Sequence, residues 1–229
     1  MATQEAIQEW GSEGIFFSEA ARGGPLPWRA GDEMLGGDAL GPTRHAHDDA
    51  AEYYYMFSGS ALCEVGGQER VLGEGELLYI PPDAPHNFFG PASDADACLY
   101  ALVAPNYANN KWRLTDFLPG SEELRMSVAT PFVDSDLPAG GTLSAEAILL
   151  DGDTEPITLK LSNCESVYVV VEGVLDMALA NGLSGSLSAG TTLHLRSGTE
   201  HVLSASDACK VLRMDCGFAE WEGVPLASD

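Results

Sequence analysis

The sequence predicts an all-β protein with two similar halves. Short apolar or alternating runs recur along its 229 residues and end at glycines or prolines, of which there are 25 and 13. This pattern is typical of many short strands joined by tight turns. One arrangement of glycine and histidine returns after about half the chain, which indicates a duplicated domain. Helical signal is weak, and only residues 3–10 are expected to form a short helix.

The expected strands follow from the apolar pattern. A short run that is continuously or alternately apolar fits a strand with one or both faces buried. These runs are 53–57, 76–80, 97–103, 143–149, 157–161, 167–171, 175–180, 191–195 and 210–214. Residues 61–72 predict a hairpin that turns at Gly66 and Gly67. Many short strands with turns between them therefore fill both halves of the chain.

Four side chains of metal-ligating type are spaced so that they can converge. His45 and His47 stand two residues apart, and residues i and i+2 of a strand point to the same face. Glu52 follows after a short turn at the start of a β-rich run. His86 comes after a second turn, rich in proline, over residues 81–85. The spacing predicts a single site that these four residues share.

The chemistry of this ligand set indicates a divalent transition metal. Three imidazoles and one carboxylate form a mixed nitrogen and oxygen shell that suits a first-row metal. Four ligands leave two positions of an octahedral shell for water, substrate or O₂, which is typical of catalytic rather than closed structural sites. Fe(II) is the metal we favour, although Mn, Ni, Zn, Co and Cu also fit this shell. The alternative interpretation is a degenerate barrel that binds no metal.

The glycines and prolines around these residues complete two motifs. The first is H-x-H-x4-E-x6-G, from His45 to Gly59, and the second is G-x5-P-x4-H, from Gly75 to His86. This pair resembles the two conserved motifs of the cupin superfamily. The resemblance implies a small jelly-roll (double-stranded β-helix) barrel with a metal held by His45, His47, Glu52 and His86. The chain departs from the family pattern at Asp83, where the family usually has glycine, and at Gly90, where it usually has asparagine.

The second half repeats the second motif. Gly190 and His201 lie 115 residues after Gly75 and His86, and Gly173 lies 114 residues after Gly59. The chain therefore resembles a bicupin. We expect an N-terminal barrel with the metal site over residues 1–112, a linker over 113–130, and a C-terminal barrel over 131–229.

The repeated copy lacks the ligands, so we expect its site to be degenerate. Counting back from Gly173 places Leu159 and Leu161 where the first copy has His45 and His47. Ser166 falls at the Glu52 position, unless a one-residue bulge brings Glu165 there. Leucines cannot ligate a metal, so His201 is expected to be a structural histidine, as is His194. The C-terminal barrel is then a packing partner that helps to shape the substrate mouth or a dimer interface.

The open metal positions predict chemistry on a small molecule. We expect a mononuclear metal enzyme, most plausibly a dioxygenase or other oxygenase that acts on a small oxygenated or aromatic metabolite. Two other classes stay open: a metal-dependent isomerase, lyase or cyclase, and a non-catalytic bicupin that binds a small molecule. Glu52 is a candidate proton acceptor. Strand alternation places Tyr54 inward beside it, either as a candidate catalytic hydrogen-bond donor or as a core aromatic.

Charge and cysteine content narrow the partners. The net charge is −24, from 35 acidic and 11 basic residues, so binding to nucleic acid or to an anionic membrane is not expected. The acidic start of the chain lacks the features of a signal peptide, which predicts a cytoplasmic protein. The five cysteines form no C-x-x-C pair and are expected to be free thiols. Exposed strand edges leave a homodimer open.

Overall fold

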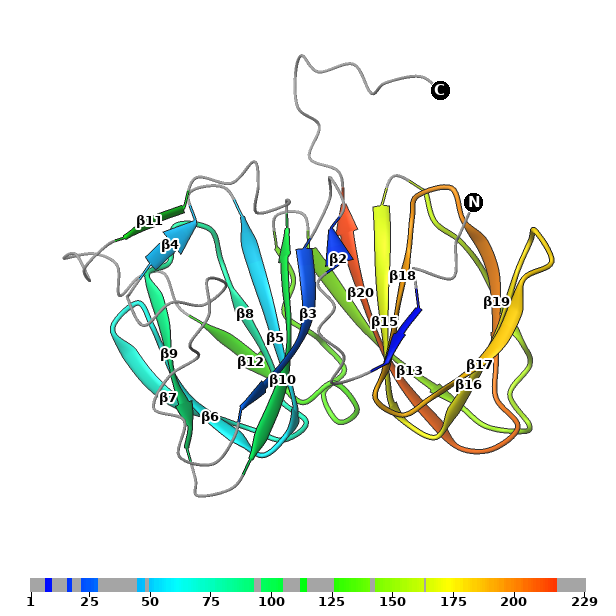
Figure 1. Cartoon of the computed structure of the whole chain (residues 1–229), viewed down its shortest axis with the longest axis horizontal. Coiled ribbons are helices and arrows are strands. Elements are labelled where there is room, and N and C mark those ends of the chain that lie inside the picture. The colour runs from blue at the N-terminus through cyan, green and yellow to red at the C-terminus, as the bar shows by residue number, and fades with distance from the viewer. Residues whose placement is uncertain are drawn as a thin grey trace, which may run out of the picture.

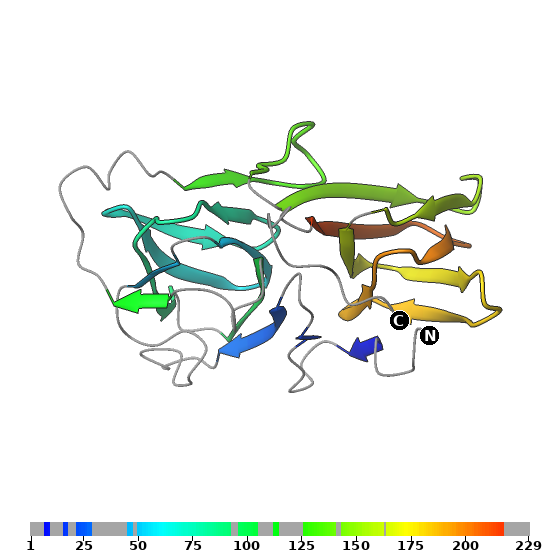
Figure 2. The same cartoon turned by 90° about the horizontal axis from the view of Figure 1, so that it is seen from above.

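The computed structural model describes residues 7–9, 16–17, 22–28, 45–47, 50–92, 96–104, 112–114, 126–140, 143–162 and 164–217. These residues form twenty strands and no helix, so the all-β prediction is confirmed. The strands build two barrels that lie next to each other in the two views of Figure 1 and Figure 2. Within the described ranges, nothing helical is long and apolar enough to cross a membrane. The five cysteines, all within the described ranges, form no disulfide, as expected.

The N-terminal barrel consists of two sheets. The six-stranded sheet has the order β12-β8-β5-β10-β3-β2. Its strands are β2 (Phe16–Phe17), β3 (Arg22–Trp28), β5 (Ala51–Ser58), β8 (Leu77–Ile80), β10 (Ala97–Ala104) and β12 (Ser127–Ala129). The five-stranded sheet has the order β11-β4-β9-β6-β7. Its strands are β4 (His45–His47), β6 (Ser60–Val65), β7 (Gln68–Gly73), β9 (His86–Pro91) and β11 (Trp112–Leu114).

The C-terminal barrel repeats this plan with a five-stranded and a four-stranded sheet. The larger sheet has the order β1-β18-β15-β20-β13 and the smaller one β14-β19-β16-β17. The strands of the larger sheet are β1 (Ile7–Glu9), β13 (Leu143–Leu150), β15 (Cys164–Glu172), β18 (Thr191–Leu195) and β20 (Cys209–Gly217). Those of the smaller sheet are β14 (Ile157–Lys160), β16 (Val174–Leu179), β17 (Ser184–Ser188) and β19 (Glu200–Ser204).

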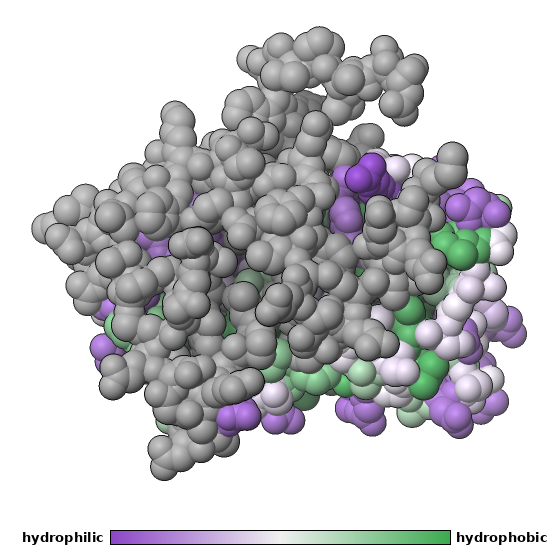
Figure 3. Space-filling model, in the orientation of Figure 1, coloured by the Kyte–Doolittle hydropathy of each residue, from purple (hydrophilic) through white to green (hydrophobic). Residues whose placement is uncertain are grey.

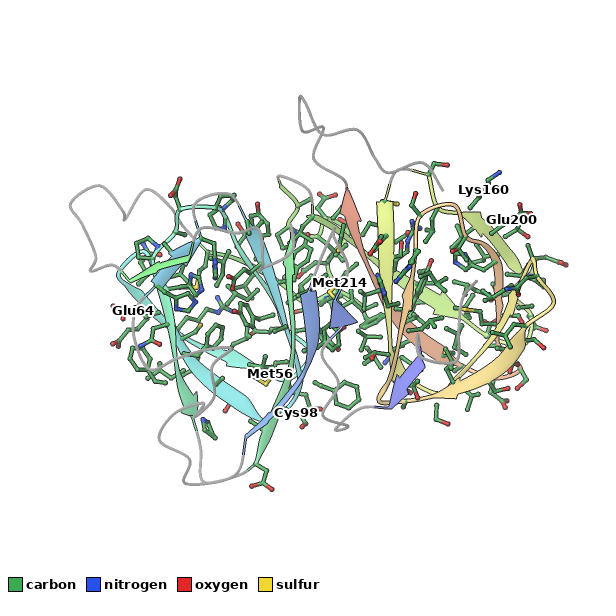
Figure 4. All side chains as sticks on the ribbon, turned by 45° about the horizontal axis from the view of Figure 1, so that its top comes forward. Met56, Glu64, Cys98, Lys160, Glu200 and Met214 are labelled. Carbon is green, nitrogen blue, oxygen red and sulfur yellow. The ribbon has the colours of Figure 1, made fainter. Side chains whose placement is uncertain are left out.

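Strand β5 shows how alternation builds both the interior and the contact between barrels. Tyr54 and Met56 point into the N-terminal barrel, where Figure 4 labels Met56. Tyr53 and Tyr55 point the other way, toward the C-terminal barrel. All four side chains are buried, because β5 has a barrel interior on one face and a second barrel on the other.

The two barrels share one apolar core between their larger sheets, which we call the interface cluster. It combines buried residues from both halves of the chain. They are Ala51, Tyr53, Tyr55, Leu77, Tyr79, Tyr100, Leu102, Leu143, Val167, Val169, Leu212, Met214 and Cys216. Figure 4 shows Met214 between the barrels. Burial of this many large side chains against one another ties the halves into one molecule.

The duplication is visible in the turns. Gly59 and Gly173 have φ values of +74° and +80°, and each turn lies beside an irregularity in strand pairing. A Cβ atom on Gly59 would lie 2.6 Å from the carbonyl oxygen of Asp96. Only glycine fits both the left-handed conformation and the close backbone approach. The repeat of 114 residues therefore reflects a shared structural need.

Two short strands complete sheet edges that the sequence did not predict. Strand β1, from the segment expected to belong to the N-terminal barrel, pairs with β18 of the C-terminal barrel. Strand β12, from the expected linker, pairs with β8 of the N-terminal barrel. The helix expected over residues 3–10 is wrong where the structure describes it, since Ile7–Glu9 is a strand. Backbone pairing at a sheet edge outweighs the weak local helical preference.

The described surface is mainly polar. On the face shown in Figure 3, hydrophilic residues predominate along the outer rim of the C-terminal barrel, with hydrophobic residues interspersed. Val174 and Leu183, for example, are 45% and 44% exposed. Single exposed apolar side chains such as these two are normal for a globular protein.

Candidate metal centre

Strands β4 and β9 bring the three histidines together. His45 and His86 are directly paired across the two strands, and their ring centroids are 4.2 Å apart. His47 lies two residues further along β4, with its ring centroid 5.1 Å from that of His45. The three rings are 0–2% exposed. The H-x-H spacing thus places both rings of β4 beside His86, as the sequence predicted.

The proline-rich turn before His86 aims its ring. Asp83 has φ of +63°, the left-handed conformation in which glycine is favoured, and this explains why the cupin pattern has glycine there. The backbone N–H of Asp83 donates to the carbonyl of His47 at 2.7 Å, which ties the turn to β4. The Nδ1 atom of His86 lies 2.9 Å from the carbonyl oxygen of Ala84. That contact orients the ring so that Nε2 faces the other three residues.

Glu52 completes the cluster from β5. Its Oε1 lies 2.6 Å from His47 Nε2, and its Oε2 lies 3.3 Å from His86 Nε2. The Tyr54 hydroxyl donates a hydrogen bond to the same Oε2. The carboxylate is 1% exposed and is therefore held by its protein neighbours rather than by bulk water.

The charges within the cluster are strongly coupled. Burial raises the pKa of Glu52, but His86 and His47 outweigh it and hold this pKa well below its ordinary range. Burial lowers the pKa of His86, but the Glu52 carboxylate outweighs it and leaves the pKa raised. A buried carboxylate is thus kept ionised by the imidazoles around it. A buried, ionised carboxylate beside imidazole nitrogens favours the binding of a cation.

The geometry fits a single metal ion. One candidate ligand atom from each of the four side chains lies within 4.8 Å of all the others. Ligands at roughly 2.0–2.2 Å from one ion stand about 3–4 Å apart in an octahedral shell, so only a small contraction is needed. His45, His47, Glu52 and His86 could therefore hold a metal, and their assignment as ligands stays a prediction.

The C-terminal barrel has the same scaffold without the ligands. Leu159 pairs with His201 as His45 pairs with His86, and Ser166 pairs with Leu195 as Glu52 pairs with Ile80. The equivalences expected from the sequence count are thus present in the strand pairing. Leu161 is buried at 1% exposed and Leu159 is partly buried, both in the apolar interior.

His201 and His194, the two histidines expected to be structural, both contact other side chains of the C-terminal barrel. His201 Nε2 lies 2.8 Å from the Tyr168 hydroxyl, and burial lowers the pKa of this imidazole. His194 Nε2 lies 2.7 Å from Glu165 Oε2. Glu165 does not take the Glu52 position, because Ser166 occupies it and no bulge intervenes there. That alternative is wrong, since a regular strand alternates its faces strictly.

Sequence reasoning missed an ion pair at this end of the C-terminal barrel. Arg213 Nη2 lies 2.7 Å from Asp215 Oδ2, and Asp215 also accepts a hydrogen bond from the Ser166 hydroxyl. The available signal in the sequence was that Arg213 and Asp215 stand two residues apart in an otherwise apolar run, so that both side chains point to the same face of a strand. Recognising their place required the pairing of β15 with β20, which a single sequence does not show.

Comparison with known proteins identifies the type of fold. Residues 33–103 match the family model described as the cupin domain. The matched residues lie in the N-terminal barrel, whose architecture agrees with that family. The C-terminal barrel has the same cupin-type architecture, so the chain is built from tandem cupin barrels. No curated protein matches the chain in sequence.

Solved structures share this tandem cupin fold at low sequence identity. One is the salicylate 1,2-dioxygenase of Pseudaminobacter salicylatoxidans, with a TM-score of 0.66 and 17% identity over 88% of this chain and 72% of that one. A mutant of this enzyme in complex with gentisate gives a TM-score of 0.65 and 14% identity over 88% and 70%. Protein Ylba from E. coli gives 0.63 and 12% over 94% and 92%. At these identities the likeness shows the fold alone.

Proposed function

We propose that this cupin is a mononuclear metal-dependent oxygenase that acts on a small oxygenated or aromatic metabolite. The observation that carries the proposal is the buried cluster of three imidazoles and one carboxylate inside the N-terminal barrel. A fold shared with a salicylate 1,2-dioxygenase supports it. Shape alone cannot assign a reaction, so the argument depends on the donor set.

The proposed roles divide between holding a metal and handling a proton. His45, His47, Glu52 and His86 would hold one divalent transition metal, with Fe(II) favoured. Such a metal supplies Lewis acidity and, as Fe(II), the ability to bring substrate and O₂ together. Glu52 is also the candidate proton acceptor, because a carboxylate that leaves the metal can take a proton from a bound substrate. Tyr54 holds Oε2 of Glu52 in place through its hydroxyl.

The barrel wall contributes by keeping bulk water out. The interior next to the cluster consists of apolar side chains, among them Phe88, Leu78 and Ile80. A dry surrounding strengthens the electrostatic interactions within the site and limits side reactions of the bound substrate. A small-molecule substrate is the partner that this interior fits.

The same cluster also fits a reaction without O₂. The hydrogen bond from Tyr54 to Glu52 gives a carboxylate that is positioned for proton transfer, which an isomerase, lyase or cyclase would use. The identity of the bound metal separates the two candidates, because oxygen chemistry of the proposed kind needs a redox-active ion.

The first experiment is elemental analysis of protein purified without oxygen and without a metal-affinity tag. Stoichiometric iron, followed by O₂ uptake with catechols, diketones or hydroxy acids, would support the oxygenase. Stoichiometric zinc would favour the isomerase or lyase. A protein that contains no metal and takes none up would overturn both proposals.

A panel of alanine variants tests the ligand assignment. Alanine at His45, His47, Glu52 or His86 is expected to lower metal occupancy about tenfold or more, because each removes one of four donors. His201→Ala is the matched control from the C-terminal barrel and should leave occupancy unchanged. Loss of the metal in the His201 variant would contradict a single site in the N-terminal barrel.

A further inference from the structure

Strand β13 is the outermost strand of the larger sheet in the C-terminal barrel, and Figure 2 shows it as the long green strand at the upper margin of the molecule. It pairs with β20 along its whole length, and none of the described strands pairs with its other side. At its start, the backbone N–H and C=O of Leu143 bond to Gly140, both at 3.0 Å, on the side away from β20. Both groups of a residue point to one side of an antiparallel strand, and that side alternates along the strand. The N–H and C=O groups of Ala145, Ala147 and Leu149 therefore point to the free edge.

This edge lacks the features that normally prevent pairing. Free strand edges are usually protected by charged side chains, by proline or by a bulge. The edge strand β7 of the N-terminal barrel follows this rule with Glu69 and Arg70, both exposed. Strand β13 contains no lysine or proline, and its pairing with β20 has no bulge. Its single charged side chain, Glu146, lies 3.3 Å from Arg213 of the same barrel.

A groove of about 350 Å³ lies along this edge. Its lining includes Glu146 from one face of β13 and Ala145 and Ala147 from the other, which places it at the edge of the strand rather than over one face. The turn before β13 forms the opposite wall with Phe132 and Leu137. The small side chains of the two alanines leave room there for a larger apolar group.

The rim of the groove presents two apolar side chains to solvent. Val133 and Leu149 are the most exposed large apolar side chains of the described residues, at 80% and 60%, and both line the groove. A hydrogen-bonded turn holds Val133 outward, since the C=O of Thr130 accepts from the N–H groups of Val133 and Asp134, each at 2.9 Å. Two such side chains beside a free strand edge indicate a surface that another molecule covers.

The groove is continuous with the established contact between the barrels. Phe132, Leu137 and Ala145 line the groove and also pack against the interface cluster. A molecule bound in the groove would therefore extend an apolar contact that already exists.

The acidic side chains at the groove are held within their own copy. Asp134 accepts a hydrogen bond from the N–H of Thr130, and Glu146 pairs with Arg213. Each chain carries a net charge of −24, so two copies repel each other overall and can associate only where few unpaired carboxylates meet. The groove provides such a face.

We propose that a second copy of this chain pairs edge to edge along β13 and forms a two-fold symmetric dimer with one continuous sheet. When three outward-pointing residues pair antiparallel with their own copies, Ala147 lies on the axis and Leu149 lies opposite the partner's Ala145. The three free N–H groups of each copy then meet the C=O groups of the other. The exposed Leu149 fills the space that the small Ala145 leaves, so the edge is complementary to itself. This contact is independent of the metal site.

The first test is the molecular mass of the full chain, measured by sedimentation over micromolar concentrations. The wild type should form a dimer, and Leu149→Lys should raise its dissociation constant about tenfold or more, because the side chain is large, apolar and central to the contact. Val174→Lys is the matched control, since it replaces another exposed apolar residue, 45% exposed, with the same charge on β16. It should dimerise as the wild type does.

A cysteine pair tests the register and avoids a disruptive substitution. Opposite residues of a hydrogen-bonded pair have Cα atoms about 5.5 Å apart, which suits a disulfide. Ala147→Cys should therefore give a crosslinked dimer under mild oxidation. Leu149→Cys should not, because the two copies of residue 149 would be offset by four residues, or about 13 Å.

Salt separates this contact from one held by ion pairs. Raising the KCl concentration screens the repulsion between two acidic chains, so dimerisation should strengthen. Weaker dimerisation at high salt would contradict an apolar strand contact. A wild type that is monomeric throughout, a Leu149→Lys variant that dimerises normally, or an Ala147→Cys variant that does not crosslink would overturn the inference and leave the proposed metal site untouched.

Discussion

At the scale of single residues, Tyr54 is the side chain whose surroundings the structure describes most usefully. Alternation along β5 predicted that it points inward, and the interior cluster confirms this. The role predicted for it from the sequence is to donate a hydrogen bond to a bound ligand. In the structure its hydroxyl donates to Glu52 instead, while its ring packs on Phe88. Tyr54 thus joins the aromatic core to the carboxylate.

Tyr54→Phe tests this link. If the proposed site is right, the variant should keep its metal, since the four proposed ligands remain, but kcat should fall roughly tenfold to a hundredfold because Glu52 is no longer held in one orientation. The measurement is turnover together with metal content. An unchanged kcat would return Tyr54 to a purely packing role, and loss of the metal would show that its hydroxyl supports ligation.

Residue identity in the cluster was predictable because ligand chemistry and strand period are both local. The surroundings of the cluster were not. The left-handed turn at Asp83 and its bond to the His47 carbonyl depend on how two distant strands meet.

At the scale of elements, glycine turns hold each barrel together. Gly59→Ala is expected to destabilise the protein by about 2–4 kcal/mol, since the methyl group meets the Asp96 carbonyl and the conformation itself is strained. Gly75→Ala is the matched control. Its φ of +81° is similar, but nothing lies within 4 Å of the new Cβ, so about 1–2 kcal/mol is expected.

Urea unfolding of both variants measures the difference. Equal losses of stability would mean that backbone strain alone matters and that the close approach at Gly59 is relieved by a shift of the 96–97 backbone. A larger loss for Gly59→Ala would confirm that the turn is packed against its neighbour strand.

The positions of the longer strands were largely predictable, because an apolar run bounded by glycine or proline indicates a buried strand. The run predicted at 143–149 appears as Leu143–Leu150, and that at 191–195 as Thr191–Leu195. Several strands were not predicted, among them β3, β17 and β19 and the short edge strands β1 and β12. Strands β1 and β12 are three residues long, and each forms by pairing with one sheet edge, β18 and β8 respectively. Pairing of that kind leaves no periodic pattern.

At the scale of the whole molecule, the interface cluster couples the barrels. Met214 is fully buried in it, so Met214→Ala should lower the free energy of unfolding by about 2–5 kcal/mol. Because residues of both barrels pack on it, release of the metal and loss of β-structure should shift together on heating. If the variant released its metal at the same temperature as the wild type but lost part of its β-structure at a lower temperature, the barrels would unfold separately.

The pairing of β1 with β18 and of β12 with β8 has a consequence for any attempt to separate the two barrels. Strand β1 precedes the strands of the N-terminal barrel in the sequence but completes a sheet of the C-terminal barrel. A C-terminal fragment that begins after residue 129 would therefore lack β1 and leave the edge of β18 unpaired, and an N-terminal fragment that ends before residue 127 would do the same to β8.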